Sequence, residues 1–240
     1  MKRHMLSVYL LAVVTLLVTT PKVWAIPFSK TKIIIEVNAT AGDAGIQVFL
    51  DATGWRSLEV FDPNGQKLLN ISASANGSIG KQGLTELFFE SAEPSFAEQS
   101  LDELFARFPE GNYTFVGITV DGGKLNGKAT LKHNIPAGPE IVFPSEGATL
   151  SPNAVVIGWN PVNGPFSGTA LPVTIVGYQV IVERVKPQPL RVFSVDLSAA
   201  VTEVTVPPEF LQANAEYVFE VLAIEASGNQ TISEGGFKTQ

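Results

Sequence analysis

Histidine and cysteine, the side chains most often used for nucleophilic and metal chemistry, are almost absent from this sequence. The 240 residues contain no cysteine, and beyond residue 25 they contain one histidine, His133. The missing thiols exclude a disulfide framework, a thiolate zinc site and thiol catalysis. A Ser-His-Asp site would have to use His133, but the chain has no Gly-x-Ser-x-Gly motif for it to serve. We therefore predict no catalytic residues, no cofactor, no bound metal and no enzymatic activity.

Oxygen-bearing side chains are plentiful, and one run has the composition of a calcium site. Glu36, Asn38, Thr40 and Asp43 follow one another closely. Their spacing matches no EF-hand loop, and Asp43 followed by Ala44-Gly45 also fits an ordinary turn, so calcium binding stays open. A hydrolase that uses two carboxylates is a further hypothesis, which requires a cleft where the two groups face each other.

Two aromatic residues are candidate contacts for a partner. Trp55 is the only tryptophan between residues 26 and 138, and a planar ring of this kind can stack on a sugar. Phe166 lies in a proline- and glycine-rich connection of 15 residues, 160–174, which is long unless it binds something. The structural alternatives are that Trp55 is buried at the start of a strand and that Phe166 folds back over the end of a sandwich.

The first 25 residues have the pattern of a secretory signal peptide. Lys2, Arg3 and His4 precede an apolar run of 14 residues from Met5 to Val18, which is shorter than the roughly 20 residues of a membrane-spanning helix. The small-residue site Val23-Trp24-Ala25 predicts cleavage after Ala25. We therefore expect a secreted or periplasmic protein with no membrane span after cleavage, and the absence of cysteine favours a bacterial source.

Length and composition limit the number of domains and the kinds of partner that the mature protein can have. Removal of 25 residues from 240 leaves 215, which suits two domains of about a hundred residues each. With 45% hydrophobic residues the chain can bury cores, which disfavours disorder. The leader carries three positive charges as Lys2, Arg3 and Lys22, so its loss changes the formal net charge from -7 to -10. This charge opposes binding to nucleic acid or to an anionic lipid surface.

Residues 26–135 predict an Ig-like β-sandwich, because short β-rich runs are separated by turn residues such as Asp62-Pro63-Asn64-Gly65 and Asp121-Gly122-Gly123. The expected strands are Ile33–Val37, Ile46–Leu50, Leu58–Phe61, Lys67–Ile71, Leu84–Phe89, Tyr113–Val120 and Lys124–His133.

One segment of this half has helical rather than strand periodicity. Residues 95–108 predict an inserted short helix with a Ser95–Glu98 capping box, and its apolar stripe most simply covers the sandwich. Pro109 ends it, and the turn that follows delivers Tyr113 to the core.

Residues 136–138, within Asn134-Ile-Pro-Ala-Gly-Pro139, predict a linker. The stretch 139–240 after it resembles a fibronectin type III domain. The residues that carry the resemblance are Trp159, Tyr178, Leu211, Tyr217, Ala223 and Gly228 in this order. Ala213 and Ala215 depart from the proline and threonine usual in that family, which leaves the subfamily open.

The resemblance implies a sandwich with Trp159 at its centre and Tyr217 hydrogen-bonded back toward Leu211 as a tyrosine corner. It also implies adhesion, spacing or partner presentation rather than catalysis, although no Arg-Gly-Asp tripeptide is present.

We accordingly predict an all-β fold of two tandem β-sandwiches, acting as an exported, non-catalytic interaction or spacer protein that contacts another protein. The alternative is a carbohydrate-binding or cell-envelope accessory protein. A structure separates the two, because sugar binding requires Trp55 or Phe166 to be exposed.

Overall fold

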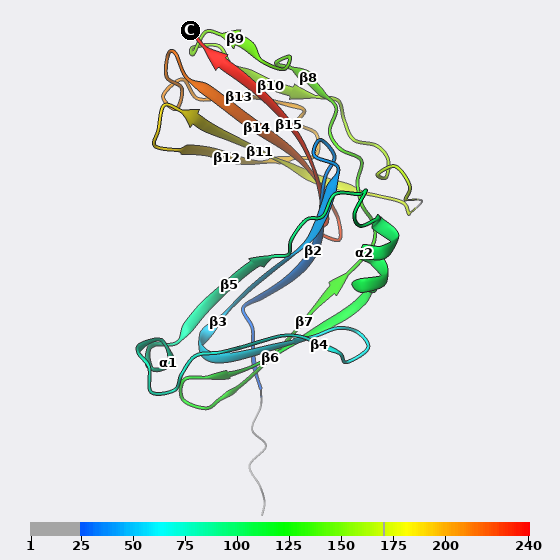
Figure 1. The fold of residues 1–240 in the computed structure, drawn as a ribbon, viewed down its shortest axis with the longest axis vertical. Coiled ribbons are helices and arrows are strands. Elements are labelled where there is room, and N and C mark those ends of the chain that lie inside the picture. The colour runs from blue at the N-terminus through cyan, green and yellow to red at the C-terminus, as the bar shows by residue number, and fades with distance from the viewer. Residues whose placement is uncertain (1–24, 170) are drawn as a thin grey trace, which may run out of the picture.

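The computed structural model describes residues 25–169 and 171–240, and strands dominate them (Figure 1). Two apolar cores follow each other along the chain, so the fold is all-β with two tandem β-sandwiches, as predicted. The predicted signal peptide lies outside the described residues except for Ala25. Within the described residues, no helix combines the length and the apolar character that a membrane span needs.

The first core belongs to the N-terminal half, residues 26–135, which strands and two short helices enclose. These elements are β1 (Ile26–Pro27), β2 (Lys30–Asn38), β3 (Asp43–Phe61), β4 (Lys67–Ser72), α1 (Ser78–Gln82), β5 (Leu84–Glu90), α2 (Leu101–Arg107), β6 (Gly111–Thr119) and β7 (Lys124–Leu131).

Strand β3 is a single bent strand where the sequence predicts two. Its first part pairs with β2 and β5, and its second part pairs with β4 and β6. The pairing shifts register between Asp51 and Trp55, a stretch that contains Gly54, and such an irregularity lets a strand bend without breaking. One strand therefore contributes to both layers of this half.

Helix α2, Leu101–Arg107, is shorter than the helix predicted over residues 95–108. Ser95 and Glu98 do not cap it but close a separate turn, in which both the backbone N–H and the hydroxyl of Ser95 donate to the Glu98 carboxylate. The capping box is formed by Ser100 and Glu103 instead. Two Ser-x-x-Glu patterns follow each other in the sequence, and only the second opens a helix. Helix α1 was not predicted.

The second core belongs to the C-terminal half. Its strands are β8 (Ile141–Phe143), β9 (Ala148–Leu150), β10 (Val156–Trp159), β11 (Ile175–Lys186), β12 (Arg191–Ser198), β13 (Glu203–Thr205), β14 (Glu216–Glu225) and β15 (Gln230–Thr239). A small sheet in the order β13-β10-β8 lies opposite a larger one that contains β15, β14, β11 and β12.

The aromatic residues of the C-terminal core lie as the resemblance implies. Trp159 is 3% exposed and packs on Tyr178, with 5.2 Å between the ring centroids. The Tyr217 hydroxyl accepts a hydrogen bond of 2.8 Å from the backbone N–H of Gln212, one residue beyond Leu211. The N-terminal half contains a similar tyrosine hydrogen bond, in which the Tyr113 hydroxyl donates to the Pro109 carbonyl at 3.1 Å.

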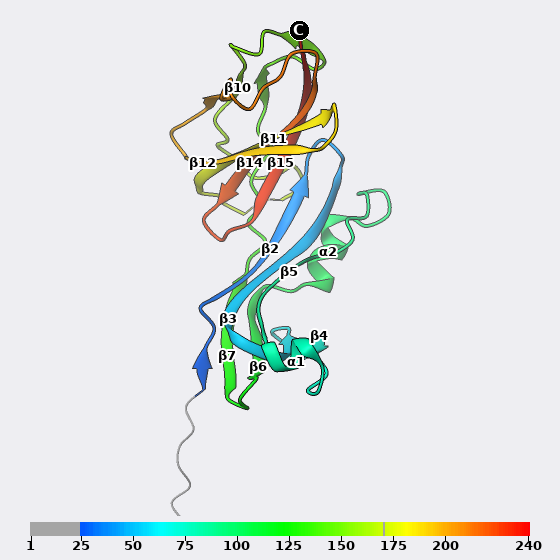
Figure 2. The ribbon, with the colours of Figure 1, turned by 90° about the vertical axis from the view of Figure 1, so that its left-hand side faces the viewer.

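The two halves share one sheet. Strand β15 pairs in parallel with β2, with Gln230 opposite Glu36 and Ile232 opposite Asn38. The larger sheet therefore runs without a break from the N-terminal half to the C-terminal half, and Figure 2 shows β2 alongside β15 at the bend.

The turn between β14 and β15 fastens this junction. The buried Asn229 amide donates to the carbonyls of Lys132 and Asn134, at 2.7 and 3.0 Å, and its oxygen accepts from the Ile35 N–H at 2.9 Å. Gly138 allows a close approach nearby, because a Cβ at this position would lie 2.7 Å from the Ala39 Cβ. The molecule is thus a bent unit with an inner and an outer side (Figure 1).

Candidate functional site

An acidic hollow lies at the bend, where the shared sheet passes from one half to the other. It has a volume of about 440 Å³, and no lysine, arginine or histidine is among the residues that line it. We call this site the acidic hollow. Its lining residues are Glu36, Asn38, Gln47, Glu90, Glu93, Gln179, Ile181, Glu220, Leu222, Gln230, Ile232 and Glu234.

Strand register brings four of the five glutamates together from distant parts of the sequence, and the fifth, Glu93, follows β5. Glu36 lies opposite Gln230 across the β2–β15 pairing, and Glu220 lies opposite Glu234 across the β14–β15 pairing. Glu90 lies opposite Gln47 across the β3–β5 pairing. Because side chains of paired residues point to the same face of a sheet, these carboxylates gather on the inner side of the molecule.

Glu36 is the buried member of the group, with 6% of its surface exposed. Its two carboxylate oxygens accept hydrogen bonds from the amides of Gln47, at 2.8 Å, and Gln230. Burial raises the pKa of Glu36 to about 7, and the carboxylates of Glu90, Glu93 and Glu220 add to the rise, whereas the Gln230 hydrogen bond opposes it. The hollow therefore resists holding all of its carboxylates ionised.

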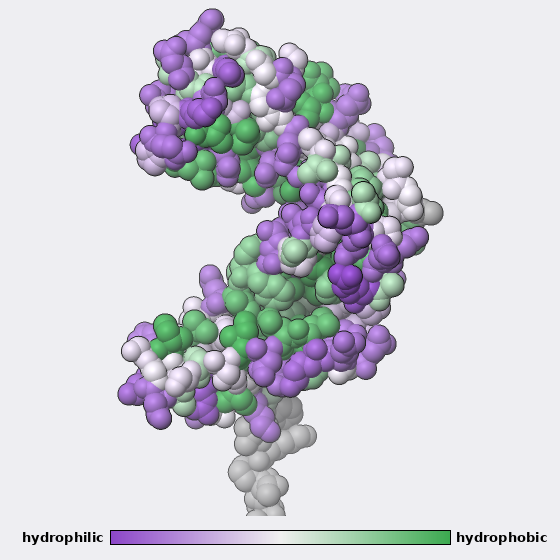
Figure 3. Space-filling view, in the orientation of Figure 1, coloured by the Kyte–Doolittle hydropathy of each residue, from purple (hydrophilic) through white to green (hydrophobic). Residues whose placement is uncertain are grey.

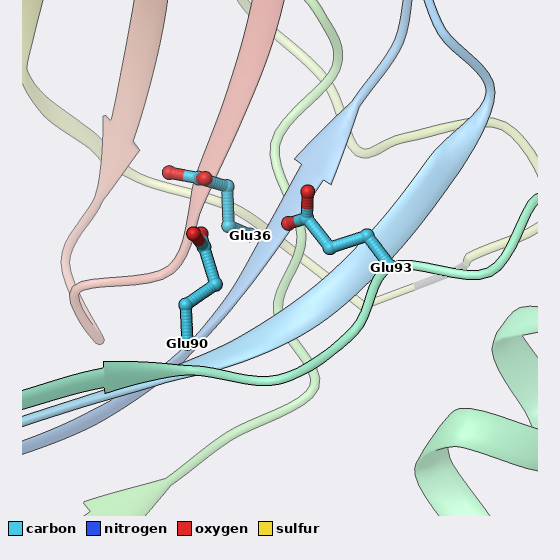
Figure 4. A group of neighbouring side chains, drawn as sticks. All are labelled: Glu36, Glu90 and Glu93. Atoms are coloured by element: carbon cyan, nitrogen blue, oxygen red, sulfur yellow. The ribbon is translucent and has the colours of Figure 1, made fainter.

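Glu90 and Glu93 approach Glu36 from β5 and from the segment that follows it (Figure 4). Gly45 makes room for Glu93, because a Cβ at residue 45 would lie 2.8 Å from the Glu93 side chain. Partial burial, with repulsion by Glu90 and Asp43, raises the pKa of Glu93 to about 6. From the C-terminal half, Glu220 has a raised pKa because of burial and because Glu234, Glu183 and Glu90 lie near it.

The geometry of Glu36, Glu90 and Glu93 would suit a cation, because one oxygen from each lies within 4.8 Å of the others. Carboxylate oxygens are the ligands that hard cations prefer. The Glu36 oxygens, however, already accept hydrogen bonds from two amides. Among the described residues, the ion pairs join Glu59 to Lys67 and Glu216 to Lys186 and Lys238, all away from the hollow. The hollow thus presents carboxylates that form no ion pair within 4.0 Å among the described residues, and the nearby cation that acts on Glu36 is Lys32.

Of the four residues in the candidate calcium run, Glu36 and Asn38 line the acidic hollow. The Asn38 oxygen accepts from the backbone N–H groups of Thr40 and Ala41, as in an Asx-type turn. The Thr40 hydroxyl accepts from the Glu234 N–H at 2.9 Å. These oxygens shape the β2–β3 hairpin, and only Glu36 takes part in the carboxylate group with Glu90 and Glu93.

The prediction that Trp55 contacts a partner is wrong. Trp55 is 0% exposed in the N-terminal core, so its ring cannot stack on a sugar. The structural alternative holds, because the strand carries this side chain to the inner face.

The structure places Phe166 against the protein, partly buried. It packs on the N-terminal core and lies 5.8 Å from the Phe96 ring centroid. The Phe166 N–H donates to the Ile135 carbonyl, and the Ala137 N–H donates to the Gly164 carbonyl, both at 2.9 Å. The connection 160–174 of the C-terminal half therefore clamps the N-terminal half, and the candidate contact is a part of the junction.

His133 likewise has a structural role. Its ring stacks on Phe105 with 4.1 Å between centroids, and its Nε2 lies 2.9 Å from the Phe108 carbonyl oxygen. The histidine of the described residues thus holds the region after α2 in place.

Sequence reasoning missed Glu90, Glu93, Glu220 and Glu234. Glu90 directly follows the predicted strand Leu84–Phe89, and no motif links it to the other three. For Glu90 and Glu220 the sequence signal is even spacing, as in Glu86-Leu-Phe-Phe-Glu90 and Glu216-Tyr-Val-Phe-Glu220, because strand residues four apart share a face; the spacing does not identify a partner.

Comparisons with known proteins add little to this description. No protein-family model matches the chain, and no curated protein matches it. Among solved structures, the chain is similar to a segment of two fibronectin type III domains from chicken tenascin, with 11% sequence identity and a TM-score of 0.29. The match covers 88% of this chain and 98% of that one.

Proposed function

We propose that this chain is an exported, non-catalytic interaction protein that binds a cationic protein segment in the acidic hollow. The observation that carries the proposal is the gathering of five glutamates from both halves around one hollow that no basic residue lines. Burial and mutual repulsion raise the pKa values of Glu36, Glu93 and Glu220, and an incoming lysine or arginine would relieve that repulsion.

A fixed junction favours this function over a flexible spacer. The β2–β15 pairing, the Asn229 hydrogen bonds and the Phe166 clamp all join the two halves. Because they hold the carboxylates in place before a partner arrives, little conformational freedom is lost on binding.

The hollow fits a cationic segment better than a sugar. None of its lining residues is aromatic, so it offers no ring for stacking against a pyranose. Hydrolysis by a carboxylate pair is also disfavoured, because Glu36 is buried and both of its oxygens accept hydrogen bonds from glutamine amides.

The test is the binding of a fluorescent ten-residue lysine peptide to the chain from Ile26 onward, measured by anisotropy. Glu90→Gln with Glu93→Gln removes two exposed carboxylates of the hollow. Glu203→Gln with Glu209→Gln removes the same charge from exposed positions elsewhere. We expect the first pair to weaken binding about tenfold and the second less than about twofold, with binding lost as salt rises. Equal effects of the two pairs would contradict the proposal, because only net charge would then matter.

A further inference from the structure

The N-terminal sandwich has an apolar cleft of about 330 Å³ that opens between β4 and β5, separate from the acidic hollow. Its floor includes Val48 and Val60 of β3, and its walls include Leu69 of β4 and Phe89 of β5. Figure 3 shows apolar surface gathered around a hollowed area of the N-terminal half, below the bend.

The bend of β3 explains why the core is open here. Val48 lies opposite Phe89 in one layer, and Val60 lies opposite Leu69 in the other, so all four side chains point into the space between the layers. In the described residues, β4 and β5 pair only with β3, and neither is joined to the other. Val48 and Val60 are almost fully buried, whereas Leu69 and Phe89 remain partly exposed along the opening.

Two polar side chains stand among these apolar ones. Gln66 precedes β4, and Arg107 is the last residue of α2. Arg107 is exposed and forms no ion pair within 4.0 Å in the part of the chain that the structure describes. Glu103, one turn earlier on α2, is held by the Ser100 capping box and is attracted by Arg107 without forming an ion pair within 4.0 Å. No carboxylate of the described residues is thus paired with the guanidinium, which can meet an anion at the cleft.

The size and the chemistry of the cleft fit a small amphipathic molecule. Sites for small molecules are mostly apolar, have a few placed polar groups, and begin at about 300 Å³. A cleft of this size suits one aliphatic chain, and a planar guanidinium suits a carboxylate, which it can bind with two hydrogen bonds.

We propose that this cleft binds a monocarboxylic acid with a single aliphatic chain, the chain lying against Val48 and Val60 and the carboxylate meeting Arg107. The site is independent of the acidic hollow, so either proposal can fail alone.

Decanoate is the probe, and calorimetry on the chain from Ile26 onward is the measurement, below the concentration at which decanoate forms micelles. We expect saturable binding of one decanoate per chain. Arg107→Gln should weaken it about tenfold, because the charge-assisted contact is lost. Arg191→Gln, which changes an exposed arginine of the C-terminal half, is the matched control and should leave the affinity unchanged.

Val48→Phe should abolish binding by filling the floor of the cleft. A thermal melt checks that this variant folds. A second measurement tests the site in the unaltered protein and so does not depend on the variant. Decanoate with a nitroxide at the end of its chain should broaden the methyl NMR signals of Val48 and Val60 in the unaltered protein.

Binding that is not saturable, or that broadens methyl signals of the C-terminal half instead, would overturn the proposal. So would decanoate binding that is insensitive to both Arg107→Gln and a folded Val48→Phe. Two further probes test other occupants, namely phosphatidylglycerol vesicles and an extended peptide of alternating valine and threonine. Binding of either one without decanoate binding would assign the cleft to a membrane or to an added strand and would reject the small-molecule site.

Discussion

Glu36 shows how strongly the environment of a side chain affects its protonation. Its sequence neighbours place it in an ordinary strand, yet the folded chain buries it near three other carboxylates, Glu90, Glu93 and Glu220. Lys32, the cation on the same face of β2, does not line the hollow. The carboxyl group is therefore protonated more readily in the folded chain than in the unfolded one.

The pKa of Glu36 predicts how stability depends on pH. Its value is 4.5 in an ordinary setting and about 7 in the fold, so the folded state binds the proton more tightly. The stabilisation by this proton is fully present below about pH 4.5 and is lost as the pH rises through 7. We expect Glu36 alone to lower the free energy of unfolding, measured with urea, by about 2–3 kcal/mol between pH 5 and pH 8, and the raised pKa of Glu93 adds to the fall.

Glu36→Gln imitates the protonated group at every pH. It should be more stable than the unaltered chain at pH 8 and about equal to it at pH 5. The smaller dependence of stability on pH that Glu93 causes should remain in this variant. Stability that rises with pH in the unaltered chain, or identical slopes in the two proteins, would refute this reading of the hollow.

The turn between β14 and β15 supplies hydrogen-bond partners for backbone groups at the junction, as a capping residue does at the end of a helix. Asn229 satisfies three backbone groups of the N-terminal half with one side chain. It directly precedes Gln230, where the three-residue pairing of β15 with β2 begins, so the pairing of these strands and the Asn229 contacts depend on each other.

Asn229→Ala should therefore weaken the junction. It leaves three backbone groups without their partner, and we expect the free energy of unfolding to fall by about 2–4 kcal/mol in urea. Asn163→Ala is the control, because the exposed Asn163 amide contacts only the nearby Pro161 carbonyl, and it should cost less than about 0.5 kcal/mol. Equal losses in the two variants would show that Asn229 does not fasten the halves.

The local sequence pattern predicts where strands and helices lie better than it predicts where they end or how they connect. Alternating apolar residues located the strands, and Trp159 and Tyr217 located the core of the C-terminal sandwich. Pattern could not decide which of two Ser-x-x-Glu pairs caps α2, because both satisfy the same local rule. It also split β3 in two, since only the pairing with β4 and β5 shows that the strand continues.

The joining of the two halves had no sequence signal at all. Glu36 and Gln230 stand 194 positions apart, and their contact follows from a parallel pairing that no turn or repeat announces. The acidic hollow exists only because of this pairing, so residue types and spacing could not reveal it. For the same reason the sequence leaves two interpretations of Phe166 open, contact with a partner and packing on its own chain, and only the fold shows that it packs on the N-terminal core.

The larger sheet is bent and continuous through both halves, five glutamates gather on its inner side, and binding of a cationic segment there is the central claim. An amide NMR titration of the chain from Ile26 onward with the ten-residue lysine peptide tests it most directly. We predict that signals of β2, β5, β14 and β15 around the hollow shift together, with one affinity for both halves. Shifts scattered over the outer surface, or confined to one half, would contradict the account.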